Sequence, residues 1–107
     1  MAKYLFTASY SKDGLEGLAK GGAASRVGVL TDMCRSLGGS LESFHWAFGD
    51  DDVYIIVDLP DDETAAAVSL TVARAGTVSD LTTVKLLTAE QMDAALSRDV
   101  GYRPPGA

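Results

Sequence analysis

The run from Val53 to Val57 is the segment that most restricts the fold of this chain. Its residues are Val, Tyr, Ile, Ile and Val, so apolar and mostly β-branched side chains occupy both alternating positions. Successive side chains of a strand point to opposite faces, and a strand that is apolar on both faces is typical of the interior of a sheet. The run therefore predicts a central strand with neither face left to water.

Three further segments have strand patterns. Residues 3–10 are rich in aromatic and apolar types and contain no glycine or proline, and residues 78–87 mix Leu, Val and Thr. Residues 41–48 alternate between two sides, with aromatic residues on one of them. The composition of residues 49–51 indicates a turn, so residues 41–48 and the central strand are predicted to form a hairpin.

Helical patterns separate these strands. Apolar spacing predicts a helix over residues 23–37, which two glycines end. Residues 60–75 predict a second helix, because acidic residues occupy its first turn and an alanine-rich run follows. Thr88 and Gln91 hold the positions of a capping box, which predicts a last helix. Four glycines within residues 14–22 predict only a short helical turn followed by a break, in a mobile flap.

The order of these elements predicts an α+β fold of the ferredoxin-like type, β-α-β-β-α-β. Both helices would cover one face of a four-stranded antiparallel sheet, and an extra helix would follow. Apolar residues on both sides of the strands would leave the second face unfavourably exposed, so the pattern predicts a homodimer or higher homo-oligomer. We assign residues 1–97 to this domain and residues 98–107 to a flexible C-terminal tail.

Composition and charge restrict the partners of the chain. Its 107 residues suit one domain, and a formal net charge of −6 disfavours nucleic acid and anionic membranes. The first residues lack the apolar core of a signal peptide, and the longest apolar run is too short to cross a bilayer. A single cysteine agrees with a reducing compartment. These features predict a soluble, cytoplasmic protein without a membrane partner.

A set of short motifs resembles the GYD-domain proteins, which are similar to the dimeric α/β-barrel superfamily. The resemblance spans Tyr4 to Leu96 and rests on these residues: Tyr10-Ser11, Gly14, Arg26, Leu37-Gly38-Gly39, Gly49 to Asp52, Val53 to Val57, Pro60-Asp61-Asp62 and Gly76. It implies the same fold and a dimeric barrel, but no defined activity. Superfamily relatives include monooxygenases, lactone isomerases, haem-handling enzymes and ligand-sensing domains. Asp51 replaces the tyrosine of the family's Gly-x-Tyr-Asp motif, so no role of that ring is carried over.

His45 is the first candidate for catalysis. It is the only histidine, and imidazole is the side chain best suited to proton transfer near neutral pH. Its small neighbours on the same strand side, Ser43 and Ala47, would leave space for a cavity between sheet and helix. The alternative is a hydrogen-bonded core histidine.

Four other residues are candidates for ligand binding. Tyr10 ends the first strand beside the glycine-rich loop, where sites are common. The resemblance singles out Asp52, which could orient Arg26 or a ligand, with a structural salt bridge as the alternative. Trp46 belongs to an aromatic stripe with Phe44 and Phe48, which predicts either dimer-interface packing or a ligand platform.

Metal and thiol chemistry have weaker sequence support. One histidine and one cysteine fall short of a zinc set, and residues 50–52 are better interpreted as a solvated turn than as a cation site. Cys34 lies on the apolar face of its predicted helix, which indicates a small buried hydrophobe, with a Cys34–His45 nucleophile pair as the alternative. We therefore predict no cofactor.

These features predict a protein that binds a small organic molecule. If it is an enzyme, it is expected to be cofactor-independent, with His45 transferring the proton. The first alternative is a non-catalytic oligomeric module that senses a metabolite or acts as a scaffold. The second is a small haem or metal protein, in which His45 would be the ligand.

Overall fold

A computed structural model describes residues 1–107 and contains four strands and four helices. In chain order these are β1 (Ala2–Tyr10), α1 (Lys12–Gly21), α2 (Ala23–Ser36), β2 (Ser40–Trp46), β3 (Val53–Leu59), α3 (Asp62–Ala75), β4 (Val78–Leu86) and α4 (Ala89–Leu96). All strand pairs are antiparallel, in the order β2-β3-β1-β4. The predicted α+β, ferredoxin-like fold is confirmed, with β3 as a central strand. No helix is both long and apolar enough to span a bilayer.

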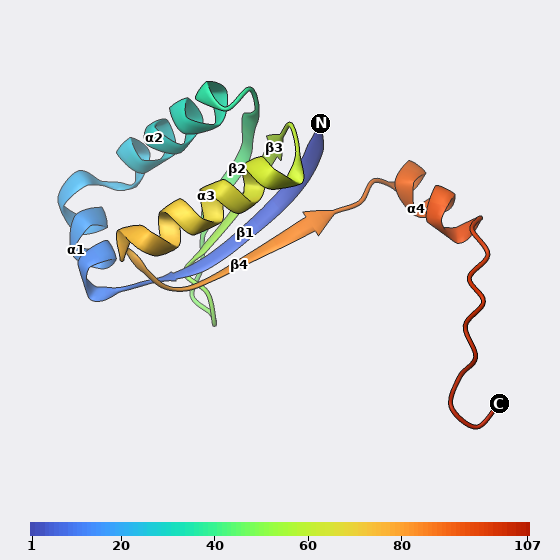
Figure 1. Cartoon of the computed structure of the whole chain (residues 1–107). Helices are drawn as coiled ribbons and strands as arrows, with labels where there is room; N and C mark the ends of the chain where they lie inside the picture. Colours follow the sequence, from blue (N-terminus) through green and yellow to red (C-terminus); the bar gives the residue numbers. More distant parts are fainter.

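Helices α2 and α3 cover one face of the sheet, and no element covers the other (Figure 1). The core lies between this helix layer and the sheet, and its buried residues come from both: Tyr4, Phe6, Cys34, Val57, Leu59, Ala65 and Val68. Cys34 is completely buried here, as its position on the apolar helix face predicts. The sheet therefore has a covered face and an open face.

The strand register identifies the residues of the open face. Phe6 pairs with Ile55 on the covered side, so the alternating neighbours Leu5 and Ile56 pair on the open side. Tyr54 of the same strand is 39% exposed. The prediction that both faces of the central strand are covered is therefore not met within one chain.

Helix α1 differs from its prediction. The glycine-rich segment forms a ten-residue helix, which ends only at Gly22, whose φ is +86°. The Ser11 side chain caps the helix by accepting a hydrogen bond from the Gly14 N–H at 3.1 Å. A β-carbon at Gly14 would lie 1.9 Å from the Thr77 carbonyl oxygen. The Ser11 cap stabilises the helix, and the close approach to Thr77 explains the glycine at position 14, so the prediction of only a short turn, made from glycine helix propensity, was wrong.

Helix α4 begins as predicted but lies apart from the body. Thr88 and Gln91 form both hydrogen bonds of the capping box, at 2.9 and 3.1 Å. The helix and the residues after it extend away from the end of β4 (Figure 1), and every residue from Leu87 to Ala107 is exposed. The chain therefore consists of a packed body and a projecting C-terminal arm, defined here as residues 87–107.

Candidate functional site

Three of the predicted site residues meet at one end of the sheet. The Tyr10 backbone N–H donates a hydrogen bond to Asp52 Oδ2 at 2.9 Å. The Tyr10 hydroxyl accepts one from the Trp46 indole Nε1 at 3.1 Å. Trp46 is held in turn by stacking on Phe44, with 4.3 Å between the ring centroids. Tyr10 is thus oriented at both its backbone and its hydroxyl.

Asp52 ties three segments together. Its backbone N–H donates to the Ala8 carbonyl at 2.8 Å, and its own carbonyl accepts from the Ala47 N–H at 2.9 Å. It forms no ion pair with Arg26. The structure therefore places Asp52 where its carboxylate positions Tyr10, and not where it orients Arg26.

A cleft of about 270 Å³ adjoins Tyr10 and is also lined by Arg26. Glycines form much of its wall: Gly14, Gly17, Gly21 and Gly22. A β-carbon at Gly17 or Gly21, which lie one turn apart on α1, would meet nothing within 4 Å, so these two positions leave the cleft open. The glycines that look like a flap in the sequence thus form a wall of the cleft.

Arg26 supplies the positive charge of this cleft. Its guanidinium has no carboxylate within ion-pair distance, since the ion pairs of the chain involve Lys3 and Lys85. Asp13 lines the cleft as well, so a ligand there meets one charge of each sign. A guanidinium without a partner can bind a carboxylate or phosphate through two parallel hydrogen bonds.

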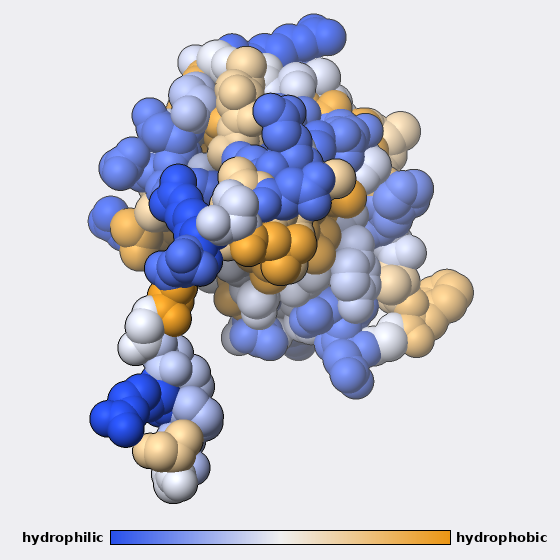
Figure 2. Space-filling model, turned by 90° about the vertical axis from the view of Figure 1, so that its right-hand side faces the viewer, coloured by the Kyte–Doolittle hydropathy of each residue, from blue (hydrophilic) through white to orange (hydrophobic).

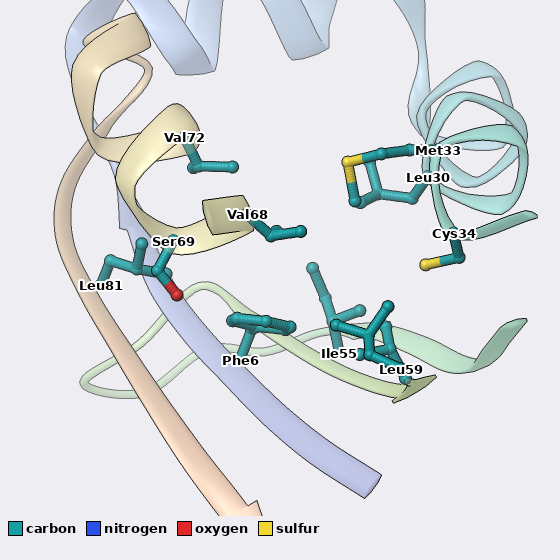
Figure 3. Close-up of a pocket in the computed structure, with 11 residues that line it drawn as sticks. Phe6, Leu30, Met33, Cys34, Ile55, Leu59, Val68, Ser69, Val72 and Leu81 are labelled. Carbon is teal, nitrogen blue, oxygen red and sulfur yellow. The ribbon is translucent and has the colours of Figure 1, made fainter. Parts of the chain in front are cut away.

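A second, apolar cavity of about 40 Å³ lies between α2, α3 and the sheet. Figure 3 shows Leu30, Met33 and Cys34 entering it from α2, with Val68, Ser69 and Val72 opposite them on α3. Ten of its eleven lining residues are hydrophobic. Val72 lines this cavity and the cleft, so the two spaces are neighbours.

His45 lies on the open face, away from both spaces. It pairs with Tyr54 in the strand register, is exposed, and its side chain forms no hydrogen bond. The prediction that His45 points between sheet and helix is therefore wrong. A register shift between Leu41 and Ser43 explains this, because it places Leu41 against the core but turns Ser43 and His45 to the other side.

The aromatic stripe is corrected for the same reason. Trp46 pairs with the buried Val53, so Trp46 and Phe44 lie on the helix side of the sheet and not on the face available to a second subunit. Phe48 lies beyond the end of β2 and is fully exposed. The stripe therefore contributes to positioning Tyr10, a role the sequence analysis did not predict.

The side chains form neither a thiol–histidine pair nor a cluster of metal ligands. Burial raises the pKa of the Cys34 thiol, which disfavours the nucleophilic thiolate. Cys34 and His45 lie on opposite sides of the sheet, so the Cys34–His45 pair does not form. No group of three or more histidine, cysteine or carboxylate side chains is placed to hold a metal ion.

A polar group at the edge of the covered face was missed in the sequence. The Tyr4 hydroxyl donates to Asp62 Oδ1 at 2.5 Å, and Lys85 Nζ lies 2.9 Å from the same oxygen. The hydrogen bond to Asp62 raises the pKa of Tyr4 to about 12. The tyrosine thus stays protonated near neutral pH, and the group is best explained as a tie between α3, β1 and β4.

Comparison with known proteins identifies the family. No curated protein matches the chain. The crystal structure of At3g17210 from Arabidopsis thaliana aligns with a TM-score of 0.47 at 14% sequence identity, covering 83% of this chain and 96% of that one. The GYD domain family matches residues 4–96, nearly the whole packed body together with α4. The chain therefore belongs to the GYD domain family.

Proposed function

We propose that this protein binds a small organic molecule with an anionic group in the cleft between α1, α2 and the start of β4. The observation that carries the proposal is the unpaired Arg26 guanidinium beside the oriented Tyr10 in a cleft of about 270 Å³. Convergent polar groups in a concave site are typical of small-molecule binding. Arg26 would bind the carboxylate or phosphate of the ligand.

Tyr10 would supply the second polar contact. Its hydroxyl oxygen already accepts the Trp46 hydrogen bond, so its own proton is free to be donated to a ligand oxygen. Trp46 and Asp52 act on the ligand only through Tyr10, as positioning residues. We therefore expect Trp46 and Asp52 to affect binding although neither lines the cleft.

The apolar cavity next to the cleft is too small to hold the body of the ligand. Its volume of about 40 Å³ accommodates only a small apolar group, since one water-sized sphere needs about 10–15 Å³. Val72 separates it from the cleft and would contact the apolar part of a ligand held by Arg26. A small aromatic or short-chain carboxylate would therefore lie in the cleft of about 270 Å³, with its apolar part towards Val72.

The predicted homodimer belongs to the same proposal. Two copies that pair through their open faces would cover Leu5, Ile56 and Val84 together with His45 on the edge strand β2. Proton transfer by His45 would then act on a molecule held between the two sheets, at a site separate from the cleft, and the cleft would serve binding alone. In the non-catalytic alternative, the same dimer acts as a sensor or scaffold. The cytoplasmic location remains a prediction.

Two aromatic probes of similar size, one with a carboxylate and one without, test the cleft. Benzoate and the uncharged benzyl alcohol are titrated into the isotope-labelled full chain, and shifts of the amide signals around Gly17 and Gly21 are followed. We expect Arg26→Gln to weaken benzoate binding at least tenfold, because a charge-assisted hydrogen bond contributes about 1.5–3 kcal/mol, and to leave benzyl alcohol unaffected. Arg35→Gln, an exposed arginine of the same helix, is the control. Benzoate binding that is absent, or unchanged in Arg26→Gln, would contradict the site.

His45 is tested separately. Native mass spectrometry of the full chain reports the subunit number and any retained small molecule in one measurement. Any compound so identified is then offered to His45→Ala. Unchanged turnover in His45→Ala would exclude His45 as the catalytic group, and turnover by neither protein would favour the non-catalytic binding module. Loss of turnover with unchanged binding would support proton transfer by His45.

A further inference from the structure

The C-terminal arm has an apolar surface that nothing in its own chain covers. Five of its large apolar side chains are between 51% and 81% exposed: Leu87, Met92, Leu96, Val100 and Tyr102. Figure 2 views the molecule from the side of the arm, with the free end standing clear of the body and apolar residues open among charged ones. Of these, Met92 and Leu96 are neighbours on α4, and adjacent exposed apolar side chains mark an interaction surface.

Helix α4 presents a one-sided apolar face. Met92 and Leu96 lie one turn apart on the same side, Asp93 borders them, and Glu90 lies on the other side. The helix has only eight residues, and isolated helices shorter than about 12–15 residues are marginal in water. Its capping box contributes about 1 kcal/mol, which does not replace tertiary packing. The helix thus requires a surface to pack against.

The exposed area of the whole chain is sufficient for a dimer. The accessible surface is 7363 Å², whereas a compact monomer of this mass exposes about 5,700 Å². The radius of gyration is 16.9 Å, against about 13 Å expected for a compact domain of this length. The excess of about 1,700 Å² is larger than the roughly 800 Å² that each partner buries in a standard stable interface.

The geometry of Thr88 directs the arm outward. Its backbone is extended, with φ −75° and ψ 165°, and its side chain caps α4. Helix α4 spans about 12 Å and the eleven residues after it up to about 36 Å, whereas stacked layers lie about 10 Å apart. The arm can therefore reach across a second copy.

We infer that the arm of each copy packs through the Met92–Leu96 face of α4 on a second copy of this chain, so that two arms are exchanged. The inference rests on the homodimer proposed above. The open face and the arm are continuous, because Leu86 ends β4 on the open face and Leu87 begins the arm. The second copy thus supplies the surface that the short helix lacks.

A spin label on the arm tests the exchange in the full chain. Ser97→Cys provides an exposed attachment point, and the native Cys34 is fully buried and shielded from the reagent. Labelled copies are mixed with isotope-labelled unmodified copies and refolded together. We expect paramagnetic broadening of the signals of the unmodified copy. A control sample carries the spin label and the isotopes on the same chain. Broadening in this control but not in the mixed sample, or no broadening in either, would overturn the inference.

Charged substitutions separate the arm from the open face. Met92→Asp with Leu96→Asp is expected to weaken dimerisation at least tenfold in sedimentation equilibrium. Ala94→Asp, on the opposite side of α4, is expected to change it little. A dimer unaffected by the double substitution would refute arm exchange while leaving the sheet-to-sheet dimer intact. A monomeric unmodified protein would refute the dimer, and arm exchange with it.

Discussion

The two faces of the sheet have similar residues and different environments. On the covered face, Tyr4 and Val57 are 1–2% exposed, whereas Tyr54 and Val84 on the open face are each 39% exposed. Strand β3 contributes to both sets, with Val57 on one face and Tyr54 on the other, so the difference arises from where the helices pack. An apolar strand pattern thus specifies that a face should be covered, but not by which chain.

The two faces also separate the candidate chemistry. The covered side holds the Tyr10 group and the cleft with Arg26, and the open side holds His45. Binding in the cleft needs one chain, whereas enclosure of His45 needs two. This difference can be tested by substituting each face in turn.

The largest effect is expected on the covered face. Phe6→Ala should lower the free energy of unfolding by about 3–5 kcal/mol, because it leaves a cavity in the core where Phe6 is 6% exposed. Urea unfolding followed by circular dichroism measures this loss. Thr82→Ala, an exposed residue of the open face, should change the same quantity by about 0.5 kcal/mol or less. Equal losses of unfolding free energy in the two variants would contradict the distinction between a covered and an open face.

Val84→Asp tests the open face. A carboxylate there should weaken dimerisation at least tenfold, because a buried unpaired charge is strongly unfavourable at an interface. The monomer fold should be retained, since Val84 contributes nothing to the core within one chain. Sedimentation equilibrium with circular dichroism distinguishes the two effects. A dimer of unchanged affinity would place the subunit contact elsewhere.

Two glycines of α1 should respond in opposite directions. Gly17→Ala should stabilise the chain by about 0.5–1 kcal/mol, because the position is helical and its β-carbon would meet nothing within 4 Å. The added methyl group should also reduce benzoate binding in the cleft. Gly14→Ala should destabilise the chain, since its β-carbon would clash with the Thr77 carbonyl. Thermal unfolding measures both, and a shift of the same sign would contradict the packing of α1.

The smallest effect concerns pH at the edge of the covered face. The Tyr4 hydrogen bond and then Lys85 lower the pKa of the Asp62 carboxyl below its usual range. A lowered pKa stabilises the fold above the unfolded-state value of about 3.9, and that contribution is lost as the pH falls further. Urea unfolding between pH 3 and 7 should therefore show a smaller acid-induced loss in Asp62→Asn. Identical pH profiles would show that the group of Tyr4, Asp62 and Lys85 does not contribute to the stability of the fold.

Local patterns predicted the elements well where one segment decides the outcome. The capping box at Thr88, the cap of α3 by Asp61 and the buried side of Cys34 all depend on neighbours close in sequence or on helical spacing. The prediction for α1 was wrong because the reason for Gly14 is a contact with Thr77, which is remote in the chain. The placement of His45 was wrong because one extra residue in β2 reversed the side of every residue after it.

The sequence by itself determined the α+β element order, the antiparallel sheet and the membership in the GYD domain family, since periodicity, caps and turn residues are local properties. Only the tertiary structure decided that Tyr10, Trp46 and Asp52 meet, that Arg26 and the glycines of α1 form one cleft, and that His45 lies opposite. The physical reason is that these relations depend on strand register and on contacts between distant segments, which no local pattern encodes.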